Sequence, residues 1–417
     1  GTWQQIGSDI DGEASGDGSG VVSISDDGSI VAIGASSNDG NGDNSGHVRI
    51  YQNNSGTWQQ IGSDIDGEAS GDRSGNSISL SADGSIVAVG AYNNDGGGSN
   101  TGHVRIYQNN SGTWQQIGSD INGQQPYNDQ GGFGVRSGFS VSLSDNGNVV
   151  AIGAQGWDDY ASYTHGEVRI YLNNSGTWQQ IGDTINDLSD DDKTGERVTL
   201  SGDGTVLAVS SWNGGPVRLY ERNGDNWTKT KEFTGSSGFG YSISLSEDGK
   251  VIAIGALYTN SERGAVYVYK RNNSNSWDTV GQIDGEASGD RSGSSVRISD
   301  DGTTIAIGAP WNDGGGNKSG HVRIYKIEEL TYTISPSAST INEGETLTTS
   351  ISTTNVAADT TLYYSLSGTG ITSDDFSSGA LTGSGTVDSD GNFSFSHTLA
   401  NDLATEGNET VDIKLFS

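Results

Sequence analysis

Three stretches of this chain place carboxylates and glycines in the same order, and they are the first candidates for chemistry. The sequence DGEASGD occupies residues 11–17, 66–72 and 284–290. Carboxylates at the first, third and seventh positions suit calcium, which takes about six to eight oxygen ligands. In the second copy these ligands would be Asp66, Glu68 and Asp72. The loop lacks the bidentate glutamate of an EF-hand, so a solvated turn capped by its own Asp and Ser is the alternative.

A second set of candidates is aromatic. Five aromatic residues stand directly after a repeated apolar strand, often beside Asn or Asp: Tyr92, Trp157, Trp212, Tyr258 and Trp311. Exposed rings next to carboxamides and carboxylates suit a sugar, whose C–H faces stack on the rings while its hydroxyls take hydrogen bonds. The pattern predicts a glycan-binding face. The alternative is that these rings cover the ends of the sheets and fill gaps between neighbouring repeats.

Three histidines, His47, His103 and His321, each precede the same strand, VRIY. Symmetric repetition around a ring would keep them apart, so we expect them to be structural rather than shared metal ligands. The chain shows no nucleophile elbow, Walker loop or His-Glu zinc signature. Its many acidic residues could supply a glycosidase pair, but no spacing selects two of them. We therefore predict that the protein is not an enzyme, and a hydrolase is kept as a third class.

All these residues belong to a unit that recurs six times. Each unit begins with an alternating run, an Asp-Gly or Asn-Gly turn and a strand such as VAIGA. A glycine-rich loop, a strand such as HVRIY and a closing strand such as GTWQQIG then follow. The closing tryptophans are Trp3, Trp58, Trp114, Trp178, Trp227 and Trp277. A four-stranded unit repeated at roughly 50 residues buries its faces by stacking around an axis. The sequence thus predicts an all-β fold, with a six-bladed β-propeller over residues 1–326 and type I′ turns in its first hairpins.

The order of the strands also predicts how the ring closes. The chain begins with the closing strand of a unit, whereas the sixth unit ends at residues 321–325 without one. Pairing residues 2–6 beside residues 322–325 would complete the last blade from both ends of the chain. Such a closure leaves no open sheet edge.

After about residue 326 the composition changes, because Ser and Thr replace Gly and Asn and the tryptophans stop. Five alternating runs follow, at residues 330–334, 346–351, 361–366, 392–399 and 409–415. This spacing predicts a second domain over residues 327–417, a small β-sandwich.

Charge and composition restrict the partners. The chain has 53 acidic and 21 basic residues, a net charge of −32 that would repel nucleic acid and anionic lipid. It has no cysteine, and no apolar run approaches the roughly 20 residues that span a bilayer. We expect no membrane insertion and an extracellular or cell-surface location. Because the first residue is glycine, we expect a segment of a longer protein.

The repeat resembles the FG-GAP repeat of integrin-type propellers. Phe239 and Gly240 stand ahead of an alternating run, and Gly308, Ala309 and Pro310 end the second strand of the last unit. The resemblance covers residues 1–325 and implies a propeller. The calcium loop of that family lies in the first hairpin, which here is only a tight Asp-Gly turn, so that calcium site is not carried over.

The second domain resembles a Calx-β domain, an Ig-like sandwich. The resemblance implies calcium ligands between strand ends, and the matching positions are Glu343, Asp375, Asp402, Glu406 and Glu409. The alternative is that these acids are solvated loop residues.

Together these observations predict an extracellular, non-enzymatic adhesion or ligand-binding segment of a larger surface protein. Its propeller face would bind a glycan or an extracellular protein, and the Calx-β-like module would be a spacer stiffened by Ca²⁺. The alternative is a structural building block of a filament or surface layer, which contacts other copies of itself.

Overall fold

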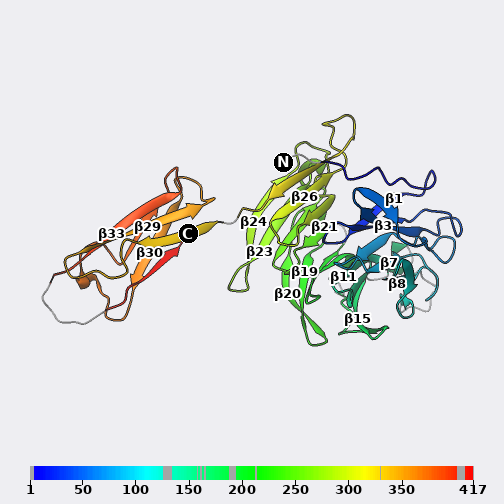
Figure 1. Ribbon diagram of the computed structural model, residues 1–417, viewed down its shortest axis with the longest axis horizontal. Coiled ribbons are helices and arrows are strands. Elements are labelled where there is room, and N and C mark those ends of the chain that lie inside the picture. Colours follow the sequence, from blue (N-terminus) through cyan, green and yellow to red (C-terminus); the bar gives the residue numbers. More distant parts are fainter. Residues whose placement is uncertain are drawn as a thin grey trace. The chain divides into compact units, whose positions relative to one another are not determined.

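The computed structural model describes residues 4–124, 134–156, 158–159, 162–163, 166–186, 194–211, 214–328, 330–401 and 409–416. The chain divides into two compact units, Gly1–Lys326 and Ile327–Ser417. Antiparallel sheets make up both units (Figure 1), so the prediction of an all-β chain is confirmed. No helix within the described ranges is long and apolar enough to cross a membrane.

The first half of the first unit contains three successive sheets. In the first sheet β1 (Ser19–Ile24), β2 (Ile30–Ala35), β3 (His47–Asn54) and β4 (Thr57–Gln60) lie in that order, and β5 (Ile65–Asp66) pairs with β3. The second sheet repeats this plan with β6 (Ser77–Leu80), β7 (Ile86–Ala91), β8 (His103–Asn110), β9 (Thr113–Gln116) and β10 (Ile121–Asn122). The third has β11 (Ser137–Leu143), β12 (Val149–Ala154), β15 (Glu167–Asn174) and β16 (Thr177–Gln180), with the small hairpin of β13 (Asp158–Asp159) and β14 (Ser162–Tyr163) beside it.

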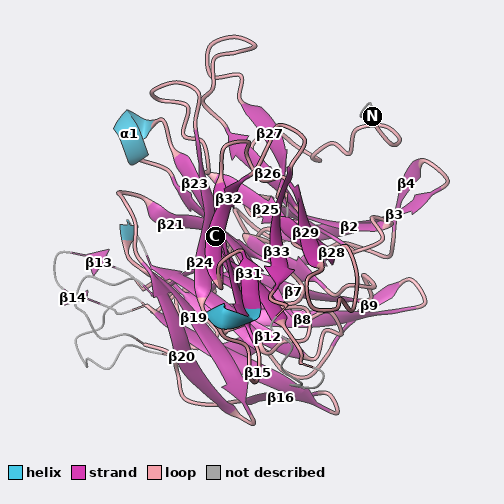
Figure 2. Cartoon of the chain, turned by 90° about the vertical axis from the view of Figure 1, so that its left-hand side faces the viewer, coloured by secondary structure: helices cyan, strands magenta, loops and turns pink. Residues whose placement is uncertain are grey.

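Three more sheets complete the first unit. The fourth comprises β17 (Thr194–Leu200), β18 (Val206–Ser211), β19 (Val217–Asn223) and β20 (Asn226–Phe233). The fifth comprises β21 (Phe239–Leu245), β22 (Val251–Ala256), β23 (Ala265–Arg271) and β24 (Trp277–Asp284), with the short helix α1 (Thr259–Glu262) between β22 and β23. The sixth has β25 (Ser295–Ile298), β26 (Thr304–Ala309) and β27 (His321–Lys326). Figure 2 shows how little of the chain is helical.

Backbone hydrogen bonds link the first hairpin turns of the six sheets in sequence order. Amide-to-carbonyl bonds of 2.8 to 3.1 Å run from each turn to the next, through Asp26, Ala82, Asp145, Gly202, Glu247 and Asp300. Burial, and then the negative charge of Asp300 at the other end of this series, raise the pKa of Asp26. The six turns therefore surround a common axis.

The first hairpins differ from the predicted type I′ turns. In the first sheet only Gly28 of the Asp27-Gly28 pair has a positive φ, 69°. The amide of Ser29 donates to Asp27 Oδ1 at 2.8 Å, and the Ser25 hydroxyl donates to the same oxygen at 2.7 Å. These side-chain bonds hold Asp27 in an ordinary conformation, so the turn needs only one left-handed residue, which is glycine.

Neighbouring sheets pack face to face through small and branched residues. One buried cluster joins Val48 and Ile50 of β3 to Ile78 and Leu80 of β6. The backbones approach closely at the glycine that recurs in the second strand, because a Cβ on Gly34 would lie 2.1 Å from the carbonyl oxygen of Gly75. Larger side chains at this position would force the sheets apart.

Three of the closing tryptophans donate a hydrogen bond to the preceding sheet or segment. The indole Nε1 of Trp114 donates to the carbonyl oxygen of Ile61 at 3.0 Å, and Trp178 makes the same bond to Ile117. Trp58 likewise donates to the carbonyl oxygen of Ile6 at 3.0 Å. The segment before β1 thus meets the first sheet as an outer strand of a preceding sheet would.

The predicted closure is not formed in the described residues. Thr2 and Trp3 lie outside them, residues 4–7 form no strand, and the sixth sheet ends at β27. Val22 of β1 and Val322 of β27 are 58% and 67% exposed, whereas Ile78, which takes the place of Val22 in the second sheet, is 8% exposed. Closure by the N-terminal strand stays a prediction.

The second unit contains two sheets. One has the order β28 (Thr331–Pro336), β29 (Thr346–Thr354), β33 (Asn392–Leu399) and β31 (Phe376–Ser378), and the other has the order β32 (Thr382–Thr386), β30 (Thr361–Ser367) and β34 (Asp412–Phe416). A short 3-10 helix, η2 (Ser373–Asp375), precedes β31. Ile351 of β29 and Leu362 of β30 are fully buried in one cluster, so both sheets contribute to a common core.

Candidate functional sites

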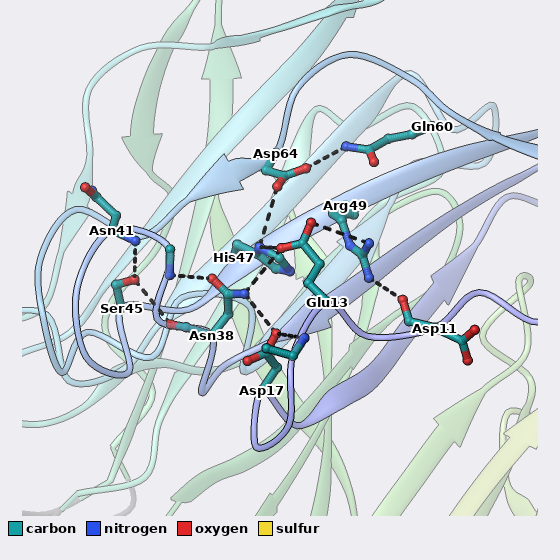
Figure 3. A network of polar contacts seen from close by, with 12 residues as sticks. Asp11, Glu13, Asp17, Asn38, Asn41, Ser45, His47, Arg49, Gln60 and Asp64 are labelled. Atoms are coloured by element: carbon teal, nitrogen blue, oxygen red, sulfur yellow. Dashed lines mark hydrogen bonds and ion pairs between the residues drawn. The ribbon is translucent and has the colours of Figure 1, made fainter.

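Polar side chains converge where the third strand of the first sheet begins. The His47 imidazole lies between the carboxylates of Glu13, from the loop before β1, and Asp64, from the segment after β4 (Figure 3). Nδ1 of His47 is 3.7 Å from Oε2 of Glu13 and 3.8 Å from Oδ2 of Asp64. Arg49 flanks Glu13, with Nη1 3.8 Å from Oε1. We call this set the imidazole–carboxylate cluster.

The second sheet repeats the cluster with Glu68, His103 and Asp120, whose potential ligand atoms all lie within 4.8 Å of one another. Nδ1 of His103 is 3.7 Å from Oε2 of Glu68. Burial, with a further contribution from the charge of Arg105, lowers the pKa of the His103 imidazole to about 4. The ring is therefore neutral at pH 7, the state in which a nitrogen can bind a metal.

The histidines were predicted to be structural because repetition around a ring would keep them from meeting one another. The histidines belong to different sheets, but His47 and His103 each meet a glutamate and an aspartate, and His321 meets Glu286 at 3.6 Å. A signal for this existed in the sequence. The three units with a histidine before the third strand are the same three that contain DGEASGD, whereas Glu167, Pro216 and Ala265 take its place elsewhere.

The three predicted calcium ligands of the second DGEASGD loop have separate partners. Asp72 is 3% exposed and accepts hydrogen bonds from the Ala69 amide, at 3.0 Å, and from Asn94 Nδ2, at 2.9 Å. Glu68 belongs to the imidazole–carboxylate cluster, and Asp66 accepts a hydrogen bond from Arg105 through its backbone carbonyl at 2.6 Å. This is the capped-turn arrangement of the alternative, and calcium binding here stays a prediction.

The predicted aromatic face is partly described. Tyr92 and Tyr258 are half-buried and Trp311 is 37% exposed, whereas Trp157 and Trp212 lie outside the described residues. Each described ring has an arginine from the following sheet or its own sheet over it. The guanidinium carbon of Arg136 lies 5.4 Å from the Tyr92 ring centre, and that of Arg291 lies 5.7 Å from Tyr258 and 3.4 Å from Trp311.

Arginines therefore form part of this face, although none of them was among the predicted residues. Arg197 continues the series, with its guanidinium carbon 5.7 Å from the Phe139 ring centre and 6.0 Å from that of Tyr241. We call the whole set the arginine–aromatic surface: Tyr92, Arg136, Phe139, Arg197, Tyr241, Tyr258, Arg291 and Trp311. A guanidinium stacked by its face on a ring keeps its N–H groups directed along the plane of the stack, where they can meet an anion.

In the second unit, three predicted calcium ligands line one cavity. Glu343, Asp375 and Glu409 share a cavity of about 940 Å³ with apolar residues such as Ile371 and Leu399. Asp402 and Glu406 lie outside the described residues. The described acids are thus brought to one place, and calcium binding by them stays a prediction.

Comparison with known proteins supports the propeller-like fold. The FG-GAP repeat matches residues 284–325, which confirms that part of the resemblance, whereas a Calx-β domain is not shown. No curated protein matches the sequence. A solved structure from Bacteroides uniformis, described as a candidate 6-phosphogluconolactonase, is 12% identical with a TM-score of 0.51, over 73% of this chain and 80% of that chain.

Two further structures are similar. A functionally unknown protein from Desulfotomaculum acetoxidans is 15% identical with a TM-score of 0.51, over 75% of this chain and 83% of that chain. The periplasmic gluconolactonase of Pseudomonas aeruginosa is 15% identical with a TM-score of 0.48, over 74% of this chain and 88% of that chain.

These comparisons correct the functional prediction. The Bacteroides protein is named as an enzyme, so the prediction of a non-enzymatic adhesion segment is contradicted, and so is its alternative of a structural building block. The physical reason is that a propeller's function is set by the side chains on its loop face and not by its repeats. At such low identity the likeness shows the fold alone and assigns no activity to this chain by itself.

Proposed function

We propose that the first unit binds an anionic sugar derivative at the arginine–aromatic surface and hydrolyses its lactone or ester bond. In this reaction water adds to the carbonyl carbon and the acyl C–O bond breaks. A lactone gives one hydroxy acid, and an open ester gives an acid and an alcohol. The observation that carries the proposal is the set of three arginines, from the third, fourth and sixth sheets, that each lie over aromatic rings. Rings of this kind suit the C–H faces of a sugar.

The charge of the surface supports an anionic substrate. The chain as a whole carries a net charge of −32, yet three arginines lie on this surface. Arg291 donates to Glu262 at 2.8 Å and Arg197 lies 3.5 Å from Glu196, so an anionic substrate would compete with these carboxylates or add to them. Burial lowers the pKa of the Arg136 guanidinium, and the positive charge of nearby Arg73 lowers it further. A bound phosphate or carboxylate would relieve this repulsion through charge-assisted hydrogen bonds. Guanidinium groups can also stabilise the oxyanion that forms when water attacks an ester carbonyl.

A hydrolysis assay tests the proposal. Lactone opening is followed by acid release at constant pH, with 6-phosphogluconolactone and neutral gluconolactone as substrates. We expect turnover above the spontaneous rate, and faster turnover of the phosphorylated lactone. Arg136→Gln should lower kcat/KM for that substrate by about 10-fold or more, because a hydrogen bond to a charged group contributes about 1.5 to 3 kcal/mol.

The matched control is Arg222→Gln, which removes the same charge from β19, where Arg222 lies 3.7 Å from Asp225. It should leave kcat/KM unchanged. A rate equal to the spontaneous rate with both lactones would contradict the proposal. Equal values of kcat/KM for Arg136→Gln and the parent protein would contradict the assignment of the surface.

The architecture around this site is also proposed. The six sheets would be six blades of a β-propeller over residues 1–326, and residues 327–417 would be a Calx-β-type sandwich. The face-to-face packing of successive sheets and the shared core of the second unit support this reading. An extracellular or cell-surface location stays a prediction that cell fractionation would test, and the anionic sugar would take the place of the glycan partner.

A further inference from the structure

The imidazole–carboxylate cluster of the second sheet shares no residue with the arginine–aromatic surface. We propose that Glu68, His103 and Asp120 bind a divalent transition-metal ion of the zinc class. The three residues reach one point from three elements: the loop before β6, the start of β8 and the segment after β9. The inference does not depend on the proposed hydrolysis.

His103 supplies the observation that points to a ligand. It is 1% exposed, and its Nδ1 makes no hydrogen bond to any residue in the described part of the chain. A buried polar atom without a partner costs about 1 to 3 kcal/mol, so such atoms are rare in folded proteins. This nitrogen faces the carboxylate of Glu68 at 3.7 Å. A metal ion between them would supply the missing partner.

The distances suit ligands of one ion better than an ion pair. A direct hydrogen bond would bring nitrogen and oxygen to about 2.7 to 3.2 Å. Nδ1 of His103 and Oε2 of Glu68 are instead 3.7 Å apart. Two ligands that each lie about 2.0 to 2.2 Å from the same ion are held roughly 3 to 4 Å apart.

The third sheet has a different residue at this position. There Glu167 occupies the position of His103 at the start of the third strand, and its Oε1 contacts Arg169 Nε at 3.1 Å. Glu167 thus meets an arginine of its own strand, whereas the His103 imidazole faces a carboxylate from a loop.

Neighbouring side chains orient the two carboxylates. Gln116 Nε2 donates to Oδ1 of Asp120 at 2.7 Å, and Arg105 Nη1 lies 3.6 Å from Oε1 of Glu68. Asn94 Nδ2 approaches Oε2 of Glu68 at 3.4 Å. Partners that hold ligand carboxylates in place in this way are a regular feature of metal sites.

The first sheet contains the same arrangement. Glu13, His47 and Asp64 take the three ligand positions, and Gln60 Nε2 donates to Oδ1 of Asp64 at 2.6 Å (Figure 3). The proposal therefore extends to a second ion. One imidazole nitrogen and carboxylate oxygens favour zinc or a similar ion over calcium, which takes oxygen ligands.

The test is a titration of the full chain with Zn²⁺, in buffer with excess Ca²⁺ to occupy nonspecific acidic sites. We expect two equivalents of Zn²⁺ to bind. Glu68→Gln and Asp120→Asn should each lose one equivalent, and circular dichroism should remain unchanged because Glu68 is 45% exposed. With Co²⁺ in place of Zn²⁺, visible absorption bands should appear and halve in either variant.

The matched control is Asp225→Asn, which removes one negative charge from a side chain that is 78% exposed in a turn. It should keep both equivalents and the full Co²⁺ absorption. The proposal is overturned if Asp120→Asn binds as many equivalents as the parent chain. It is also overturned if no Zn²⁺ binds in the presence of Ca²⁺.

Discussion

The carboxyl group of Asp145 shows how a single residue responds to the symmetry of the repeat. The turns around the axis bring acidic residues together, and Asp26 and Glu247 lie close to Asp145. Burial, followed by the negative charges of these two neighbours, raises the pKa of Asp145 to about 6. The fold therefore favours the protonated form of this carboxyl group.

The sign of the resulting pH dependence follows from linkage. An acid whose pKa is raised on folding stabilises the protein below its unfolded pKa, about 3.8, and loses that contribution as the pH rises through about 6. Asp145→Asn should therefore raise the melting temperature at pH 7.5, and the gain should shrink towards pH 4. Thermal melts at both pH values, with Asp225→Asn as the control, measure this difference. A variant that is less stable than the parent chain at pH 7.5 would contradict the interpretation.

At the scale of single residues, the sequence indicated which residues could bind a metal better than it indicated which residues lie together. Glu68 was selected as a metal ligand, but with Asp66 and Asp72 of its own loop. Its observed neighbours, His103 and Asp120, come from strands and segments that are distant in sequence. The spacing of residues along the sequence can identify ligands that share one loop. Which distant residues meet is decided instead by strand pairing, here between β8 and β9. Arg136 and Arg291 were missed because each precedes the first strand of its sheet, whereas the predicted aromatic rings follow the second.

At the scale of elements, the ends of strands and short helices gather acids in the second unit. Glu343 precedes β29, Asp375 ends η2, and Glu409 precedes β34, and all three line the same cavity. Like charges placed together destabilise the native state unless a cation binds. Calcium bound only to the folded form would stabilise it by mass action.

We therefore expect millimolar Ca²⁺ to raise the melting temperature of the second unit within the full chain. Glu409→Gln should reduce this increase by more than half, because it removes one ligand. Asp390→Asn, in the exposed turn before β33, is the control and should keep the full increase. Identical melts in calcium and in chelator would contradict calcium binding.

Strand positions were predictable because the alternation of apolar and polar residues along a strand indicates which of its faces is buried. The predicted run at residues 392–399 coincides with β33, and that at residues 361–366 differs from β30 by one residue. The short strands β31 and β32 were not predicted. Gly383 and Gly385 lie in β32, and a strand with glycine at alternate positions has no apolar pattern to detect.

At the scale of the whole first unit, the remaining question is how the ring of sheets closes. Val22 and Ile24 of β1 are each 58% exposed, although the corresponding positions of the second sheet are buried against the first. Val322 and Ile324 of β27 are 67% and 47% exposed. The two uncovered faces are of the same kind as those that pack together between the other sheets. Burial of such apolar surface contributes about 25 cal/mol per Å², which favours their contact.

Crosslinking tests this closure, because the chain has no cysteine of its own. In the double variant Val22→Cys, Val322→Cys, closure would place the two thiols as near to each other as Ile78 and Val48 are in their shared cluster. A short bismaleimide should then give an intramolecular crosslink whose yield does not depend on protein concentration. Removing residues 1–8 should lower this yield, because the segment that carries Ile6 would no longer complete the sixth sheet. Each single-cysteine variant is the control and should give no intramolecular product. Crosslinked dimers from the double variant would instead mean that a second copy covers these faces, and the closure would be wrong.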